Sequence, residues 1–291
     1  MNLAVNPLQW LATDDGWLDF GKAPPLTDAL EKTSRAGFKA IMTDVPAGMT
    51  VREYRALLGR YDTVPAPGYY SSPLEDADQR DELVREAERR ADVHRELSLT
   101  EMFVAARMSP DGRRVARPAQ GVDADEGRLG EIARTLTAIG TATRERGVTA
   151  CLHQHVGSWV ESEAELEWLL ERLDPDVVAL GPDTGHLAWA RIEPVDFVRR
   201  HRDRVRSLHV KDIRLGVADR SHDDSKSYRE VVQDGLWVEP GRGDIDLRAI
   251  FDELRGGSCA WAIIEVDSPD LPSPDESIAY CGTWATRAAT W

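Results

Sequence analysis

Cysteine is scarce in this chain, and the few cysteines present show no recognisable pattern. Among 291 residues there are only Cys151, Cys259 and Cys281, an odd number without a CxxC pair. This argues against a disulfide framework and against a thiolate metal site. Cys151 and Cys259 lie in or beside apolar runs, so we expect both to be buried as small hydrophobic residues. Such cysteine usage fits a reducing compartment, and we predict a cytoplasmic protein.

Positive charge is in deficit, and long hydrophobic runs are missing. The chain has 36 Lys and Arg against 51 Asp and Glu, which gives a net charge of −15. Nucleic acids and anionic membranes attract clustered basic residues, so the composition argues against both as partners. No apolar run approaches the ~20 residues of a membrane span. The start, MNLAVNPLQW, lacks the basic and apolar regions of a secretory signal, so we expect no signal peptide.

Short apolar runs alternate with longer amphipathic segments along the whole chain. The runs predict eight strands, at 3–6, 38–43, 63–65, 99–106, 148–153, 177–180, 205–210 and 261–266. Helical spacing predicts helices at 26–35, 50–58, 74–97, 126–147, 162–173, 194–201, 247–255 and 274–290. Repeated βα units form parallel sheets, and eight of them close a barrel. We therefore predict an α/β fold, a (β/α)8 TIM barrel forming a single domain over residues 1–291.

Local signals refine this expectation at several places. Thr50 with Glu53, and Ser162 with Glu165, have the spacing of helix-capping boxes. The sequence PGYYSSP at 67–73 and the Pro-, Gly- and Arg-rich segment 109–121 are expected to be loops. The longest irregular region, 215–244, follows the seventh strand. Loops of that length inside a domain are usually functional or disordered, so we predict an active-site lid or insertion there.

Residues capable of chemistry gather at the ends of four predicted strands. Five of the seven histidines lie between His153 and His209, and the four runs TACLHQH, VVALGPDTGH, RSLHVKD and WAIIEVD end in His, Asp or Glu. The carboxyl ends of barrel strands meet at one rim, so we expect these side chains to converge there.

Asp183 and His209 are the sharpest candidates for metal ligands. Asp183 follows Gly181 and Pro182 at a strand end, with His186 three residues later; the alternative is an Asp that caps a short turn. Strand alternation places His209 and Lys211 on one side. Asp212 is interpreted as a supporting partner or as the cap of the following turn.

Glu265 ends a buried run, where a carboxylate is costly unless it is paired or metal-bound. Asp267 would point inward only if the strand register continued. His153 and His155 share a strand face, so one can ligate while the other acts as acid or base. Glu161, after the next turn, either reaches back into the site or belongs to the start of the helix.

A mixed set of His, Asp and Glu suits one divalent ion, such as Mn²⁺, Co²⁺, Mg²⁺ or Zn²⁺. Such an ion polarises a carbonyl and stabilises the charge that forms when a base removes the adjacent proton. Dehydration, isomerisation and epimerisation can all follow. Arg242, between two glycines, and Asn6 and Trp10, after the first strand, are candidate substrate contacts.

These motifs resemble the xylose-isomerase-like TIM-barrel superfamily of sugar isomerases and epimerases, and within it the inosose dehydratases. The resemblance rests on NPLQW, LHQHVGSWVES, GPDTGHLAWARIEP, LHVKD, DGLWVEPGRGDID and WAIIEVD, and it is strongest over residues 149–267. It implies a (β/α)8 barrel with one divalent metal at its carboxyl-terminal mouth. It further implies that Asp183, His209 and Glu265 are metal ligands.

The fifth strand departs from the pattern of many superfamily members, which have Glu-x-His where this chain has His153-Gln154-His155. Three interpretations stay open: His153 replaces the glutamate, His155 ligates, or Glu161 supplies the carboxylate. Inosose dehydratase-like sequences also have His-x-His here. By resemblance, His155 matches the acid/base histidine and His186 matches the histidine after the Asp.

The resulting hypothesis assigns metal binding to His153, Asp183, His209 and Glu265, and catalysis to His155, His186 and Glu265. Substrate binding is assigned to Asn6, Trp10, Glu161, Lys211, Asp212 and Arg242. The predicted enzyme removes a proton next to the carbonyl of a keto-polyol or ketose, as an inosose dehydratase-like hydro-lyase or, alternatively, as a sugar isomerase or epimerase. Manganese is among the suitable ions.

Two further alternatives belong to other classes. A non-catalytic sugar-binding or partner subunit would retain the barrel without the reaction. A phosphoesterase similar to the endonuclease IV barrel would need more metal ligands and a basic groove, which the net charge opposes. The expected partner is a small sugar or polyol, with neither nucleic acid nor membrane, and a homo-oligomer is compatible with the sequence.

Overall fold

Parallel strands form the centre of the molecule. The computed structural model describes residues 1–291. One sheet has the order β3-β2-β1-β11-β8 and another the order β4-β5-β6-β7, and every pairing in both is parallel. The strands are β1 (Asn2–Asn6), β2 (Ala40–Met42), β3 (Val64–Ala66), β4 (Tyr69–Ser72), β5 (Glu101–Ala106), β6 (Thr149–His153), β7 (Val178–Leu180), β8 (Ser207–Val210) and β11 (Trp261–Glu265).

The two sheets join into one closed barrel. Two parallel bridges close the barrel between β7 and β8: Leu180 of β7 pairs with Val205, just before β8, and Asp183, just after β7, pairs with His209 of β8. On the other side of the barrel, β3 continues into β4 through Pro67 and Gly68. β3 and β4 are therefore two halves of the third barrel strand, one pairing with β2 and the other with β5. The predicted α/β fold with eight barrel strands is confirmed.

The expectation that PGYYSSP is a loop was wrong, because Tyr69–Ser72 is strand β4. Pro67 has no N–H to donate, and the N–H of Gly68 donates to His94 Nε2 at 2.9 Å instead of to a neighbouring strand. A Cβ at Gly68 would lie 2.7 Å from the carbonyl oxygen of Thr43. The Pro-Gly pair thus interrupts a strand without ending it, which the sequence pattern did not distinguish from a turn.

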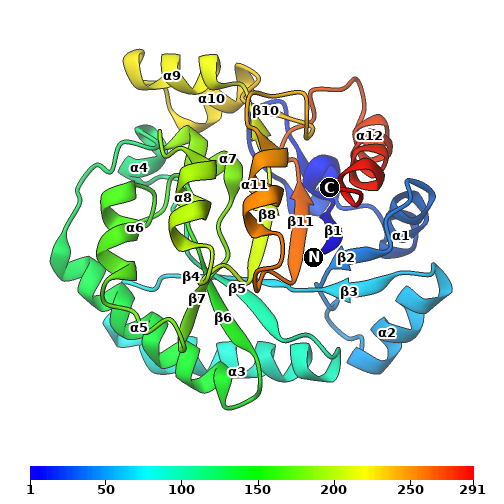
Figure 1. Cartoon of the computed structure of the whole chain (residues 1–291), viewed down its shortest axis with the longest axis horizontal. Coiled ribbons are helices and arrows are strands. Elements are labelled where there is room, and N and C mark those ends of the chain that lie inside the picture. Colours follow the sequence, from blue (N-terminus) through cyan, green and yellow to red (C-terminus); the bar gives the residue numbers. More distant parts are fainter.

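Helices surround the barrel (Figure 1). They are α1 (Leu26–Arg35), α2 (Val51–Arg60), α3 (Arg80–Glu96), α4 (Arg113–Ala116), α5 (Glu126–Arg144), α6 (Glu163–Leu170), α7 (Thr184–Trp189), α8 (Pro194–His201), α9 (Leu215–Asp223), α10 (Tyr228–Gln233), α11 (Leu247–Leu254) and α12 (Pro274–Ala288), with 3-10 turns at Leu8–Leu11, Phe20–Lys22 and Ala77–Gln79. The capping boxes at Thr50 and Ser162 are confirmed. The expected loop at 109–121 contains the single-turn helix α4.

Residues 215–244 are structured, which corrects the expectation of an irregular region. They contain α9, α10 and β10 (Trp237–Val238), which pairs antiparallel with β9 (Asp212–Ile213). Ser227 and Glu230 form a capping box that starts α10. These elements are short, so their periodicity is weak in the sequence. Figure 1 shows α9 and α10 at the end of the barrel toward which the arrow of β11 points, which is the carboxyl end of the strands.

The main hydrophobic core of 49 buried residues lies between the barrel strands and the helices. Inside the barrel, a small cluster closes the interior, consisting of Ala4, Ala40, Ala66, Phe103 and Ile263. Alanines leave room for one large ring, and Phe103 fills it directly below His209, with ring centroids 4.3 Å apart. The barrel therefore has a solid apolar floor on which polar side chains can be arranged.

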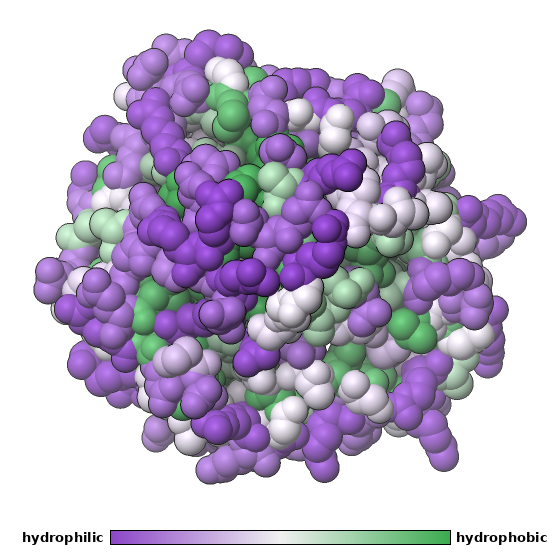
Figure 2. Space-filling model, in the orientation of Figure 1, coloured by the Kyte–Doolittle hydropathy of each residue, from purple (hydrophilic) through white to green (hydrophobic).

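The three cysteines are free and buried, and the predicted burial of Cys151 and Cys259 is confirmed. None of the helices combines the length and apolar character needed to cross a membrane. The face shown in Figure 2 is mostly hydrophilic, with small scattered hydrophobic areas, in keeping with the net charge of −15.

His94 on α3 is expected to make folding sensitive to acid. Its Nδ1 donates to the carbonyl of Arg90 at 2.7 Å and its Nε2 accepts from Gly68, so the neutral ring fits and a second proton does not. Burial lowers the pKa of His94 from 6.5 to about 4. The unfolded chain then binds a proton first, so stability is full above pH 6.5 and falls as the pH drops toward 4. The loss is about 3 kcal/mol for this group.

Urea unfolding at pH 7, 5.5 and 4.5 tests this expectation. The variant His94→Gln retains an acceptor for Gly68 without a titrating ring, so its stability should fall less over this range than that of the wild type. Parallel pH curves for the two proteins would contradict the assignment.

Candidate functional site

Three strand ends bring His153, Asp183 and His209 together. His153 ends β6, Asp183 follows β7 and His209 lies in β8. One ligand atom from each lies within 4.8 Å of the other two, and all three side chains are buried. Their position at the carboxyl end of the barrel is where the strand-end pattern predicted convergence.

Several polar atoms in this group have no hydrogen-bond partner. They are Asp183 Oδ2 and both ring nitrogens of His209. His153 Nδ1 lies 2.9 Å from the carbonyl of Gly181, which can only accept, so this nitrogen carries the proton. The lone pair of His153 is therefore on Nε2. Buried polar atoms that make no hydrogen bond are costly, so their clustering fits a site that binds a ligand.

Asp183 has two roles at once. Its Oδ1 accepts from the N–H of His186 at 2.9 Å and caps α7, while Oδ2 makes no hydrogen bond and lies 3.4 Å from the ammonium of Lys211 and 3.9 Å from His209 Nδ1. The capping and metal-ligand interpretations of this residue are therefore compatible. Gln154 fixes the backbone of Asp183 from the neighbouring strand, donating to its carbonyl at 2.8 Å and accepting from its N–H at 3.2 Å.

Glu265 reaches the same group from β11. Its Oε2 lies 3.3 Å from His209 Nδ1 and also accepts from the side-chain amide of Asn6. Its Oε1 lies 2.6 Å from the ammonium of Lys211. The Lys211 nitrogen also lies 3.4 Å from Asp183 Oδ2 and 3.0 Å from Asp267 Oδ1, so one lysine contacts three carboxylates.

Burial and this concentration of charge together shift the pKa values of the group. Burial raises the pKa of Asp183, and burial raises that of Asp267 to about 7. The pKa of Glu265 is held well below its usual value by Lys211 and His209, against the opposing effect of burial. The same carboxylates raise the pKa of Lys211 well above its usual value, although burial opposes this. When all three carboxylates are ionised, they and the one ammonium leave two negative charges, which one divalent cation would balance.

The donor set fits such a cation. Two imidazoles and at least one carboxylate are a common combination for first-row divalent metals. His153, Asp183 and His209 form the group that could hold the ion. Glu265 lies next to this group, with its oxygens bound by Lys211 and Asn6, and its ligation remains a proposal.

His155 and His186 lie together beside this group, with ring centroids 3.8 Å apart. His155 Nδ1 lies 2.8 Å from the carbonyl of Val156, so it carries the proton and leaves a lone pair on Nε2, which no protein group binds. Burial lowers the pKa of His155 to about 4, so the ring is neutral at pH 7. His186 is completely buried, between the N–H of Val156 and the ammonium of Lys211, each 3.4 Å away. The ring of His186 packs directly against the ring of His155.

A cavity of about 830 Å³ opens above these residues. Its polar part is lined by Asn6, Tyr69, His153, His155, Glu265 and Asp267. Trp10 also lines it, and its indole N–H donates to Asp275 at 2.8 Å. Of the predicted substrate contacts, Asn6 and Trp10 face this cavity, whereas Lys211 is buried beneath it.

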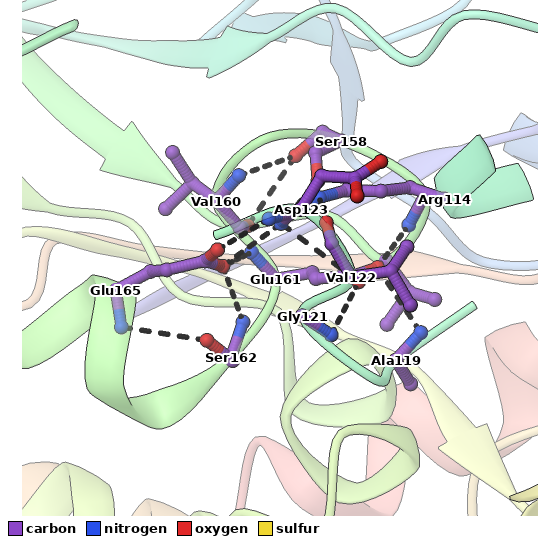
Figure 3. A network of polar contacts seen from close by, with 12 residues as sticks. Arg114, Ala119, Gly121, Val122, Asp123, Ser158, Val160, Glu161, Ser162 and Glu165 are labelled. Carbon is purple, nitrogen blue, oxygen red and sulfur yellow. Dashed lines mark hydrogen bonds and ion pairs between the residues drawn. The ribbon is translucent and has the colours of Figure 1, made fainter. Parts of the chain in front are cut away.

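Glu161 lies apart from the cavity, in the network of Figure 3. Its carboxylate accepts from the N–H groups of Ala119, Gly121 and Gly157, at 2.8–3.0 Å. The adjacent Arg114 is paired with Glu165 and also donates to the carbonyl of Ser158 at 3.1 Å. The structure thus places Glu161 where it fastens two loops, one of which follows His155.

Asp212 and Arg242 also lie outside the cavity. Asp212 accepts from the N–H groups of Gly241, Gly243 and Ile245 and so shapes the loop that carries Arg242. A Cβ at Gly243 would lie 2.3 Å from Asp212 Oδ1, so this close approach requires glycine. Arg242 is partly exposed and bound to Asp270 and Glu239.

Sequence reasoning gave too little weight to Asp267 and missed Tyr69. Asp267 lies two residues after Glu265, and the alternation that places Glu265 inward continues past the strand end, so both contact Lys211. Tyr69 lies in β4, the segment expected to be a loop, and its ring lies 5.1 Å from that of His153. Strand alternation alone could have identified Asp267 as an inward-pointing site residue. Tyr69 could not be identified in this way, because the preceding Pro67-Gly68 pair made its strand look like a loop.

Comparison with known proteins places these residues in a family context. A family model described as "Xylose isomerase-like TIM barrel" matches residues 30–282. Inosose dehydratase from Lacticaseibacillus casei is 35% identical over 147 residues, which are 50% of this chain and 49% of that protein. Inosose dehydratase from Geobacillus thermodenitrificans is 31% identical over 143 residues, 48% of each chain. The chain thus matches these curated relatives over about half their length.

Solved structures share the fold at low sequence identity. The IOLI protein, determined with a bound zinc atom, has a TM-score of 0.67 at 14% identity, with 100% of this chain and 98% of that chain covered. The 3-keto-D-glucoside 4-epimerase from E. coli has a TM-score of 0.69 at 14% identity, with 99% of both chains covered.

Replacing the carboxylate of Asp183 by an uncharged amide is expected to abolish stabilisation of the protein by a divalent ion. In Asp183→Asn the side chain can still cap α7, while the negative charge near His209 is lost. At an Mn²⁺ concentration about 100 times the Kd, the wild type should gain about 2.7 kcal/mol of stability and the variant almost none. Thermal unfolding with and without Mn²⁺ provides the measurement.

Asp246→Asn is the matched control, because Asp246 caps α11 by accepting from Ala249. It should respond to Mn²⁺ like the wild type. Equal stabilisation of Asp183→Asn and wild type would exclude Asp183 as a ligand.

Proposed function

The chain belongs to the xylose isomerase-like TIM-barrel family, and on that premise we propose that it is a divalent-metal-dependent hydro-lyase acting on a keto-polyol. The proposed substrate is a cyclic ketone bearing several hydroxyl groups, similar to the keto-inositols implied by the name of its curated relatives. The reaction removes a proton next to the carbonyl and eliminates a hydroxyl group as water.

One observation carries this proposal. The unpartnered atoms of Asp183 and His209, with His153 beside them, lie at the same end of the barrel as the free lone pair of His155. His153 and His155 both line a cavity large enough for a sugar ring. A cation site next to a neutral base is the arrangement that proton abstraction beside a carbonyl requires.

His153, Asp183, His209 and Glu265 are proposed to hold the ion. When bound, the ion supplies positive charge that polarises the substrate carbonyl and stabilises the negative charge developing as the proton leaves. Lys211 is proposed to keep the carboxylates of Glu265 and Asp267 in place, because it contacts both of them. Asn6 orients Glu265 through its side-chain amide.

His155 is proposed to move the proton. Its Nε2 accepts the proton from the carbon next to the carbonyl, and the electrons of that C–H bond form a C=C bond as the adjacent C–O bond breaks. The imidazolium returns the proton to the departing hydroxyl, which leaves as water, so atoms and charge balance. His186 packs against His155 with the two ring planes tilted by 42°, and is proposed to keep that ring in position.

Isomerisation or epimerisation would share the first step and differ in where the proton returns. Incubation with keto-inositols and ketoses in Mn²⁺ or Co²⁺ separates the outcomes. Mass spectrometry should show loss of one water from a keto-inositol together with a new conjugated ketone absorbance. A product of unchanged mass and altered configuration would instead identify an isomerase or epimerase.

Replacing the proposed base should remove turnover without removing the metal. We expect His155→Gln to lower kcat by roughly 10²–10⁴-fold, the usual contribution of a general base. Mn²⁺ affinity should stay close to that of the wild type. His201→Gln, on α8 and paired with Glu167, is the control and should retain full activity.

The outcomes are distinct. Full kcat in His155→Gln would remove His155 from the mechanism. A wild-type protein that binds Mn²⁺ and sugar but turns over no keto-polyol would favour the non-catalytic sugar-binding role.

A further inference from the structure

The cavity is larger and more apolar than a single polyol ring requires. Its volume is about 830 Å³, within the range of pockets for drug-sized ligands, whereas a keto-inositol has only about a dozen non-hydrogen atoms. The polar residues gather at the barrel rim, next to the candidate metal group. More than half of the lining residues are hydrophobic, and we call the part of the cavity that they line the apolar compartment.

The connection between β1 and α1 forms one wall of this apolar compartment. Its cavity-lining hydrophobic residues are Leu8, Trp10, Leu11, Trp17, Leu18 and Phe20. Phe20 is 72% exposed, so its large aromatic face is accessible to a ligand. We call these residues the apolar wall.

The apolar wall is fixed in place by α10. Arg229 pairs with Asp15 at 2.7 Å and lies over the ring of Trp17, and Gln233 donates to the carbonyl of Asp14 at 2.8 Å. Gly16 has a φ of +76°, and a Cβ there would lie 2.4 Å from the carbonyl of Arg229. The turn is therefore held tightly against α10, so the apolar wall is preformed in the absence of a ligand.

Tyr228 connects the apolar wall to the proposed base. Its ring lies 5.8 Å from that of Trp17 and 6.3 Å from that of His155, stacked on the latter. A ligand with its polar ring at His155 would therefore extend along Tyr228 toward Trp17 and Phe20. The two compartments form one continuous site.

The wall is poorly suited to a phosphate group. The only basic side chains lining the cavity are Arg90 and Arg107. Arg90 is paired with Glu86 and lies over the ring of Tyr70, and Arg107 donates to the carbonyl of Ser71. Asp44 lines the same cavity and would repel an anion.

From these observations we propose that the substrate carries an apolar, ring-shaped substituent that packs against the apolar wall. The proposed substrate is then a keto-polyol ring with such a substituent, namely a keto-sugar glycoside with an aromatic aglycone and not a sugar phosphate, and a free keto-inositol would occupy only the polar part of the site. This inference rests on the proposed function for the position of the sugar ring. Aromatic rings pack well against Trp and Phe side chains, which gives the aglycone a specific place.

Binding of unreactive glucosides tests this inference separately from the reaction. Calorimetry in Mn²⁺ should show phenyl β-glucoside binding about tenfold more tightly than methyl β-glucoside. Phe20→Ala should remove most of that difference and leave Mn²⁺ affinity unchanged, because Phe20 lies in the connection between β1 and α1 and is not part of the metal group. Val64→Ala, at a 52% exposed residue in β3, is the control and should behave like the wild type.

Equal binding of the two glucosides, or tighter binding of glucose 6-phosphate than of phenyl glucoside, would overturn the inference. So would a dimer that Phe20→Ala dissociates without changing glucoside binding, since a second copy would then cover the wall. If the protein bound phenyl glucoside selectively but showed neither Mn²⁺ binding nor turnover, the proposed function would be contradicted, whereas the inference that the apolar wall binds an aromatic group would still hold.

Discussion

The concentration of buried negative charge at the carboxyl end of the barrel is the constraint on which this structure depends. Asp183, Glu265 and Asp267 surround Lys211, all within hydrogen-bonding or ion-pair distance of its ammonium. One lysine cannot neutralise three carboxylates, and burial raises the pKa of both aspartates. Such buried charge lowers the stability of the fold, and a divalent cation bound beside His153 and His209 would offset it.

Other parts of the fold hold these charged side chains in position. Phe103 and the alanines of the barrel interior give it an apolar floor, so the polar side chains are confined to one layer. Asp183 is held by a helix cap and by Gln154, and the loop after His155 is fastened by Glu161. On the outer side, α10 holds the turn that carries Trp17, so the apolar wall and the polar cluster face one cavity.

The barrel and the strand-end residues were predictable because they depend on local periodicity. Apolar runs marked eight strands, and strand alternation placed His209 and Lys211 on one side. The break within the third barrel strand at Pro67 and Gly68 could not be predicted, because it depends on a hydrogen bond to His94, which lies 26 residues away along the chain. The helices α9 and α10 are too short to show a clear period. The backbone contacts of Glu161, Asp212 and Arg242 depend on loop conformations that residue type does not determine.

The most direct measurement is the position of anomalous scattering in crystals grown with Mn²⁺. Our account predicts a single strong peak between His153, Asp183, His209 and Glu265, with ligand atoms about 2.0–2.3 Å from it. Lys211 should still contact Glu265 and Asp267, as its proposed role in holding these carboxylates requires. A peak elsewhere, or no peak at all, would contradict the account.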